Sequence, residues 1–432
     1  MADNISAEHR GLIRGRSKRK HIFQDRPETK TTRSSRFAEI FNRRDADPLG
    51  LRRVLTQVMH DLYGTKDVQD AITASYVWMS DQIGHITLGL APTLLFGWIW
   101  RMIWTGGAEP HGKPGDVGDI VGCVAIALAI FAYWVHKERM DYADTWHHAP
   151  KRFEFDSSDV RWNVYTALLY FGIGGVLALS ALIDWRLLLV CFLLALWPAL
   201  RVAFWWLRRK LAFQQAGLPY LYRLANFSGN IDDEGVTAAS AVANLKNRPI
   251  GFWKVLFGRD DVEPNKPDVR HLLIAGPLRT GKTSLAVGIG TEFAFALGYG
   301  RYLTAAKLMQ LIAVQPGNNP PDSVNMEYND GRLLWPLVVC DLIIVDDVDN
   351  GVPTGAEEYA SVITPQNFED AIMKRAGSPL LWLKDQRSVW VLGNTSQVAQ
   401  WRTTIAKLLG VAESEIETIE LTVPLDKNYA PR

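Results

Sequence analysis

The chain contains few cysteines and almost no net charge. Its three cysteines, Cys123, Cys191 and Cys340, are widely spaced and form no C-x-x-C pair. This spacing argues against a disulfide framework or a cysteine zinc site and is typical of a reducing compartment. The first residues contain no short apolar core with a cleavage site, so we expect no signal peptide. The formal net charge is +1 over 432 residues, a length typical of two or three structural units.

Charged residues are scarce within four apolar stretches of the middle of the chain, residues 81–210. Four apolar spans lie there, at about residues 83–100, 117–135, 164–183 and 185–207. Their lengths match a hydrocarbon core of about 30 Å at 1.5 Å per residue, so we predict four transmembrane helices. Ten of the 16 tryptophans lie between Trp98 and Trp206, many at span ends, where the membrane interface favours them. The spans contain too few ionisable residues for a transporter, and we expect an anchor or an assembly surface.

Basic residues flank these spans on one side. Residues 1–35 form a basic tail that we expect to be flexible, and Lys and Arg outnumber Asp and Glu 14 to 7 between Met1 and Arg53. Further basic residues lie between the second and third spans and after the fourth. The positive-inside rule therefore predicts a multi-pass protein of a bacterial inner membrane with both termini in the cytoplasm. The tail either fixes this topology or contacts anionic lipid or nucleic acid.

Helices are also predicted on both sides of the membrane region. At residues 36–80, apolar residues recur every three or four positions from Leu51 to Leu62, which predicts amphipathic helices. Residues 211–270 are predicted to form a helical linker, with helices at 218–227 and 236–257. Within the spans, Arg101 is expected to extend toward the interface, and Gly172, Gly174 and Gly175 to allow close helix packing.

A phosphate-binding motif begins the last part of the chain, residues 271–432. The apolar run after His271 ends at Gly276, and Gly281-Lys282-Thr283 follow five residues later, which gives G-x-x-x-x-G-K-[ST] between a predicted strand and a predicted helix. Backbone N–H groups of such a loop surround phosphate oxygens, Lys282 reaches the β- and γ-phosphates, and the Thr283 hydroxyl binds Mg²⁺. The predicted nucleotide-binding residues are Gly276, Pro277, Leu278, Arg279, Thr280, Gly281, Lys282, Thr283 and Ser284.

Two later apolar runs end in polar residues that fit the same chemistry. The run from Leu337 to Val345 is followed by Asp346-Asp347, which we interpret as a metal ligand and a residue that orients or deprotonates the attacking water. A second run ends before Asn394, which would hydrogen-bond the γ-phosphate or the same water. The pattern predicts an α/β fold with a parallel sheet flanked by helices. Because no [NT]-K-x-D guanine motif follows the loop, ATP with Mg²⁺ is the expected ligand.

The loop, the strand DLIIVDD and the strand RSVWVLGNTSQVAQW resemble, in this order, three motifs of AAA+ ATPases of the helicase-loader and transposition-helper type (DnaC/IstB-like). The resemblance covers about residues 272–421. It implies an α/β P-loop NTPase core that assembles into homo-oligomers around ATP, and it implies nothing about the membrane region.

Three departures from that family affect the predicted mechanism. Arg279 replaces the middle glycine of the family's loop. A similar R-T-G-K-[ST] loop occurs in dynamin-like GTPases of the guanylate-binding type, where the arginine aids hydrolysis. Arg279 is therefore a candidate for transition-state stabilisation. The chain ends about eleven residues after the last predicted strand, 416–421, so a helical lid is not expected. The arginine that a neighbouring subunit would supply is not evident; Arg402 is the first candidate, with Arg387 and Arg375 as alternatives.

Three functions remain open from the sequence. The first is a membrane-anchored ATPase that assembles around ATP and acts on a cytoplasmic protein client. The second is an ATP-controlled oligomeric switch whose membrane helices are the effector, in a defence or toxin-like role. The third is a membrane-tethered ATPase that handles DNA, and it rests on the family resemblance and the basic tail.

Overall fold

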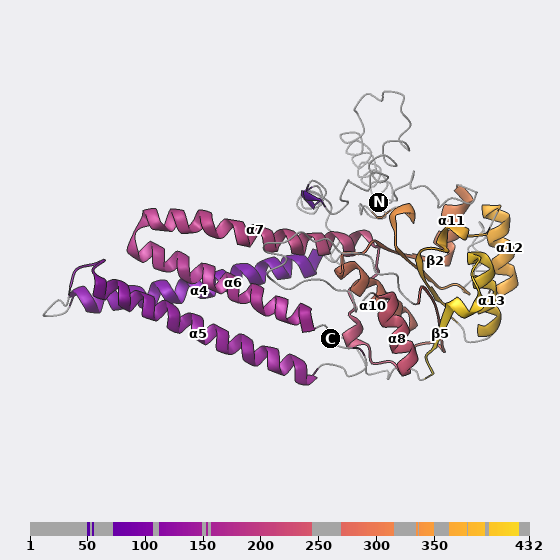
Figure 1. The fold of residues 1–432 in the computed structure, drawn as a ribbon, viewed down its shortest axis with the longest axis horizontal. Helices are drawn as coiled ribbons and strands as arrows, with labels where there is room; N and C mark the ends of the chain where they lie inside the picture. The colour runs from indigo at the N-terminus through magenta and orange to yellow at the C-terminus, as the bar shows by residue number, and fades with distance from the viewer. Residues whose placement is uncertain are drawn as a thin grey trace, which may run out of the picture. The chain divides into compact units, whose positions relative to one another are not determined.

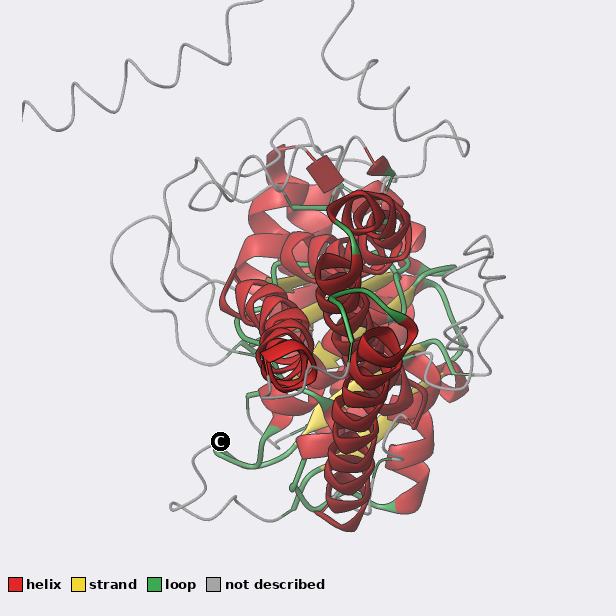
Figure 2. Ribbon diagram, turned by 90° about the vertical axis from the view of Figure 1, so that its left-hand side faces the viewer, coloured by secondary structure: helices red, strands yellow, loops and turns green. Residues whose placement is uncertain are grey.

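In a computed structural model of the protein, four long apolar helices are followed by a parallel α/β domain. The structure describes residues 50, 51, 54, 55, 72–106, 112–148, 153, 157–243, 269–314, 334, 335, 337–349, 363–377, 379–393 and 397–422. The predicted basic tail lies outside these residues. Of the amphipathic helices predicted at 36–80, the structure describes residues 50, 51, 54 and 55, and residues 72–80, which belong to the first long helix. Figure 2 marks the secondary structure of the described residues and shows the strands gathered in a single sheet.

The four predicted spans are confirmed as long helices. They are α4 (Ile72–Gly106), α5 (Val117–His148), α6 (Ser157–Ile183) and α7 (Trp185–Gln215). Each is long and apolar enough to cross a membrane, which is the arrangement of a multi-pass membrane protein.

Helix α6 packs against each of the other three long helices. Two glycines allow its close approach to α4. A Cβ on Gly174 would lie 2.1 Å from the Ile86 carbonyl oxygen, and one on Gly89 would lie 2.2 Å from that of Phe171. The predicted role in close packing is therefore confirmed for Gly174. Gly172 makes only an ordinary contact and Gly175 faces open space.

An ion pair joins α4 to the beginning of α5. Arg101 donates to Asp119 from Nε at 2.9 Å and from Nη2 at 2.8 Å, and the Asp119 side chain is fully buried. Asp119 also accepts a hydrogen bond from the backbone N–H of Gly115 at 2.7 Å. The prediction that Arg101 extends toward the interface missed this pairing, because Asp119 lies 18 residues away in sequence and only the helix packing brings it near.

Helix α7 continues past the predicted span end at residue 207 and ends at Gln215. Its last turns, including Leu211, Ala212 and Phe213, are buried against the α/β domain. One helix thus passes from the apolar span into the packed interior of the following domain.

The predicted helix at residues 218–227 is wrong. The structure has a 3-10 turn there, Leu224–Asn226, and irregular backbone before it. Arg223 and the Leu224 N–H bind Glu292 on α10 (Lys282–Phe295). Tertiary contacts therefore replace the local helix. Of the predicted helix at 236–257, the structure describes α8 (Asp233–Val242), and residues 244–257 lie outside the described part.

The α/β domain is built on five parallel strands in the order β2-β3-β4-β1-β5. They are β1 (His271–Ala275), β2 (Gly300–Thr304), β3 (Leu342–Asp346), β4 (Arg387–Val391) and β5 (Ile416–Glu420). The predicted parallel sheet is confirmed, although β3 is shorter than the apolar run at 337–345, whose first residues, Leu337–Val339, form a 3-10 turn. Every residue of β1, β3 and β4 is buried.

Helices cover both faces of this sheet. Helices α10 and α8 lie on one face, and α11 (Ala305–Val314), α12 (Pro365–Ala376) and α13 (Val398–Leu409) lie on the other (Figure 1). The helix after β1 therefore leaves the sheet on the opposite side from the helix after the neighbouring β4. Open α/β sheets bind ligands at the carboxyl ends of two such strands.

Candidate nucleotide-binding site

The loop between β1 and α10 has the backbone geometry that its glycines permit. Gly276 has φ 154° and Gly281 has φ 88°, both in the region that favours glycine. A Cβ on Gly276 would lie 2.4 Å from the carbonyl oxygen of Leu421, so a larger residue does not fit there. Gly281 precedes the first turn of α10, and among the described residues no side chain caps that turn. The uncapped N–H groups and the helix dipole form a site suited to an anion.

Lys282 is buried and directed into this loop. Its Nζ donates to the carbonyl oxygens of Gly276 and Pro277, at 2.7 Å in each case. Burial lowers the pKa of the Lys282 ammonium, while the carboxylates of Asp349, Asp346 and Asp347 act in the opposite direction. The loop carbonyls therefore hold a cation at the place where the motif predicts contact with phosphate oxygens.

Arg279 lies at the exposed tip of the same loop, beside the exposed Pro277 and Leu278. Its φ is 64°, a left-handed conformation that costs a side-chain-bearing residue roughly 1–2 kcal/mol. Thr280 is buried, and its Oγ1 donates to the Pro277 carbonyl at 3.0 Å. The half-buried Thr283 and Ser284 belong to the first turn of α10.

Asp346 and Asp347 lie at the carboxyl end of β3. Asp346 is buried and accepts hydrogen bonds from the Tyr302 hydroxyl at 2.6 Å and from the Asp347 backbone N–H at 2.8 Å. Asp347 is exposed and has φ 55°, so the chain turns sharply after Asp346. The two carboxylates therefore have different environments, one fixed by hydrogen bonds and one facing solvent.

The parallel sheet brings the loop and these carboxylates to the same edge. Strand β4 lies between β1 and β3, and the chain beyond each strand stays in register: the Leu392 N–H donates to Ile274 O, and the Val348 N–H donates to Val391 O. The ends of β1, β4 and β3 therefore lie side by side, with the helix after β1 leaving on one face and the helix after β4 on the other.

Three residues of this region were missed from the sequence. Asp349 is buried, accepts a hydrogen bond from the Gly393 N–H, and leads the carboxylates that oppose the lowering of the Lys282 pKa. Asp349 could have been identified from the sequence, because it is the third acidic residue of the run Asp346–Asp349. Tyr302 and Tyr220 gave no sequence signal, because their contacts with Asp346 and Ser284 depend on tertiary packing.

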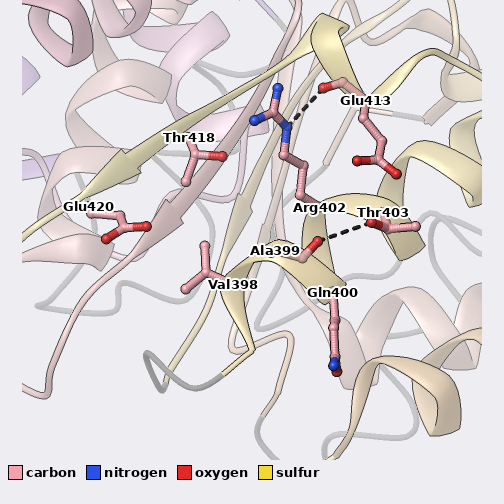
Figure 3. Close-up of a pocket in the computed structure, with 8 residues that line it drawn as sticks. All are labelled: Val398, Ala399, Gln400, Arg402, Thr403, Glu413, Thr418 and Glu420. Carbon is pink, nitrogen blue, oxygen red and sulfur yellow. Dashed lines mark hydrogen bonds between the residues drawn. The ribbon is translucent and has the colours of Figure 1, made fainter.

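Arg402 lies on α13. It lines a surface pocket of about 370 Å³ between α13 and β5, with Thr418 and Glu420 on the strand side. Its Nε donates to the Glu413 carbonyl at 2.9 Å (Figure 3). Among the described residues, no hydrogen bond joins Arg402 to the loop of its own chain. Its role in the site of a neighbouring subunit stays a prediction.

The remaining predicted site residues have varied positions. Arg387 is mostly buried at the start of β4 and lies over the Phe293 ring at 5.1 Å, as a packed structural arginine does. Arg375 lies in the last turn of α12. Asn394 lies outside the described residues.

The donor set fits Mg²⁺ bound together with a nucleotide. No cluster of three or more His, Cys, Asp or Glu side chains that could hold a metal occurs in the part of the chain that the structure describes. Mg²⁺ usually binds one or two carboxylates plus substrate phosphates rather than such a cluster. Asp346 and the Thr283 hydroxyl match that requirement, and the uncapped α10 turn provides for the phosphates.

No protein-family model matches this chain, and a search of curated proteins finds no match to its sequence. The case for function therefore rests on the residues and their geometry.

Proposed function

We propose that this protein is a membrane-anchored P-loop ATPase of the AAA+ type. The observation that carries this proposal is the uncapped N-terminus of α10, with the buried Lys282 bonded to two loop carbonyls, at the same sheet edge as the buried carboxylate of Asp346. A nucleotide triphosphate with Mg²⁺ is the ligand that needs a phosphate-binding turn, a cation and a carboxylate together.

Each residue has a distinct role in the proposed site. The N–H groups of the loop and Lys282 bind the phosphates of ATP, and Thr283 and Asp346 hold Mg²⁺, which neutralises developing charge when bound. Asp347, exposed beside Asp346, orients or deprotonates the attacking water, and Asn394 is proposed to assist it. Asp349 binds the Gly393 N–H and so fixes the chain directly before Asn394. Catalysis of this kind consists mainly of positioning and charge stabilisation.

The membrane helices place this ATPase at the cytoplasmic side of a bacterial inner membrane in our proposal. The basic segments before α4, between α5 and α6, and after the apolar part of α7 support that topology, with both termini in the cytoplasm. Subunits assemble into homo-oligomers around ATP and remodel or recruit a cytoplasmic client, a step supported only by the family resemblance.

Nucleotide binding and turnover by the full chain in lipid nanodiscs test the proposal. We expect a fluorescent ATP analogue to bind and Mg²⁺-dependent phosphate release to fall about 10²–10³-fold in Lys282→Ala. Lys307→Ala is the matched control, because Lys307 lies on α11 and its Nζ binds Gln310 instead of the loop. Equal binding and turnover in wild type and Lys282→Ala would refute a phosphate-binding role for this loop.

A further inference from the structure

A single residue, Tyr302 on β2, is bonded both to the end of α7 and to the candidate metal ligand. Its backbone N–H donates to the carbonyl oxygen of Ala216, the residue that caps α7, at 2.8 Å. Its hydroxyl donates to Oδ2 of Asp346 at 2.6 Å. Tyr302 therefore connects a candidate membrane helix, α7, to the carboxylate of Asp346 through its backbone N–H and its hydroxyl.

The end of α7 is held firmly against the edge of the sheet. Gln215 O accepts a hydrogen bond from the Trp335 backbone N–H at 2.8 Å, and Ala212 O accepts one from the Trp335 indole at 3.4 Å. The Arg209 guanidinium lies 3.9 Å from the Trp205 ring centroid and 5.9 Å from that of Phe295 on α10. With both backbone and side chains engaged, displacement of the α7 end displaces β2.

The segment after α7 makes a second contact with the same site. The Tyr220 hydroxyl lies 3.1 Å from Ser284 Oγ, in the first turn of α10. Arg223 forms an ion pair with Glu292 further along α10, with Nε 2.6 Å from Oε1. The chain leaving the membrane helix thus contacts the metal-ligand side through Tyr302 and the phosphate-binding helix through Tyr220.

We propose that Tyr302 is a positioning residue that orients Asp346 for Mg²⁺ and thereby couples metal binding to the position of α7. This inference rests on the proposed function, because it assigns regulation to the proposed ATP site. A carboxylate ligand is oriented by its hydrogen-bond donors, and Asp346 has two: the Tyr302 hydroxyl and the Asp347 N–H. The second is local to the turn after β3, whereas the first connects to α7.

The Tyr302 hydroxyl is suited to act as a permanent donor. A carboxylate oxygen has no proton to donate, so the Tyr302 phenol supplies the proton of the 2.6 Å hydrogen bond to Asp346. The direction of the hydrogen bond is therefore fixed, and only the position of β2 determines where its donor points.

Replacement of Tyr302 by Phe removes the hydroxyl and keeps the ring and the backbone N–H. In full-length protein in nanodiscs, we expect the Mg²⁺ concentration for half-maximal ATP turnover to rise about tenfold. Binding of a fluorescent ATP analogue in EDTA is expected to remain unchanged, since the loop and Lys282 are intact. Tyr222→Phe is the matched control, because its hydroxyl donates to Asn226 O at 2.9 Å and not to Asp346.

Hydrogen exchange of the full-length protein tests the coupling without relying on activity. We expect ATP with Mg²⁺ to slow exchange in peptides from the loop 276–284 and in peptides containing the Tyr302 amide. In Tyr302→Phe, the loop peptides should still be protected and the slowing around residue 302 should be lost. If the loop is protected but residue 302 never responds in wild type, the coupling is refuted and the proposed function stands. If no nucleotide binds and the loop is not protected, the proposed function fails, and the coupling with it.

Discussion

The membrane helices and the α/β domain place the same apolar residue types in opposite positions. On α7, Leu194 is 69% exposed and Trp185 equally so, whereas every residue of β1, β3 and β4 is buried. In the first region apolar side chains face the surrounding medium, and in the second they form the core. Burial against other protein groups therefore stabilises the α/β domain. For the outward faces of the helices, contact with lipid replaces contact with protein.

Polar groups differ between the two regions in the same way. Between the membrane helices α4 and α5, Arg101 pairs with the buried Asp119. The α/β domain gathers Lys282, Asp346 and Asp349 at one sheet edge, where each has hydrogen-bond partners. The first arrangement joins structural elements, and the second presents charge to a ligand.

The largest expected effect is on packing of the α/β core. Trp401 on α13 is 2% exposed and packs on Phe368 with ring centroids 5.5 Å apart. Trp401→Ala should cost about 3–5 kcal/mol and lower the unfolding midpoint of the domain by about 10 °C. Trp197→Ala, on the exposed face of α7 at 49% exposure, should change it by less than about 3 °C. Thermal unfolding of both variants in detergent measures the contrast, and equal losses would mean that a second protein surface covers that face of α7.

The next effect concerns one buried and one exposed ion pair of the membrane helices. Asp119→Ala leaves Arg101 without its buried partner and should destabilise the protein by about 3 kcal/mol. Lys137→Ala breaks the exposed pair with Asp141 and should cost less than about 0.5 kcal/mol. The double variant Arg101→Met/Asp119→Leu should recover most of the loss. Unfolding in mixed micelles separates these cases; a small loss in Asp119→Ala would show that the site is hydrated.

A smaller, pH-dependent effect is expected from a buried histidine in β1. His271 is fully buried, with Nδ1 2.9 Å from Ser388 Oγ, and burial lowers the pKa of its imidazole. Because the folded pKa lies below the unfolded value of about 6.5, its contribution to stability is complete above about pH 6.5 and is lost as pH falls through the folded pKa. Melting of the α/β domain between pH 8 and pH 5 measures this, and His271→Gln should flatten the curve. If the melting temperature depends on pH in the same way in wild type and in His271→Gln, another titratable group causes the pH dependence.

The smallest expected effect is at the tip of the phosphate loop. Because Arg279 has φ 64°, Arg279→Gly should stabilise the domain by about 1 kcal/mol. A fall in ATP turnover in this more stable variant would support the proposed transition-state role of Arg279, since lost folding would not explain it. Unchanged turnover would remove that hypothesis.

Sequence pattern predicted the elements whose signal is local. The spans between Ile83 and Leu207 and the strands around Gly276 and Asp346 each follow from composition and spacing over a few residues. Helix ends were less well predicted, because α7 continues to Gln215 only where the next domain buries it. Residues 218–227 were predicted as a helix from their pattern, but the contacts of Arg223 and Leu224 with Glu292 hold this segment in another conformation.

The site was predictable to the extent that its residues lie in one motif. The loop and Asp346 were found because strand ends and glycine spacing are visible in the chain. Tyr302 lies 44 residues from Asp346, and Tyr220 lies 64 residues from Ser284, so their contacts depend on strand order and on the path after α7. Asp349 lay within the acidic run and could have been identified from the sequence.

Helix α7 also fixes the length of the connection between the membrane helices and the α/β domain. The helix is continuous from Trp185 to Gln215, with Pro198 inside it, and there is no loop to absorb a change in length. Inserting one residue between its exposed and buried parts would rotate one part against the other by about 100° and displace it by about 1.5 Å. Seven added residues would restore the angular phase to within about 20°. We therefore expect the protein to tolerate insertion of whole heptads between the lipid-facing part of α7 and the domain, but not insertion of single residues.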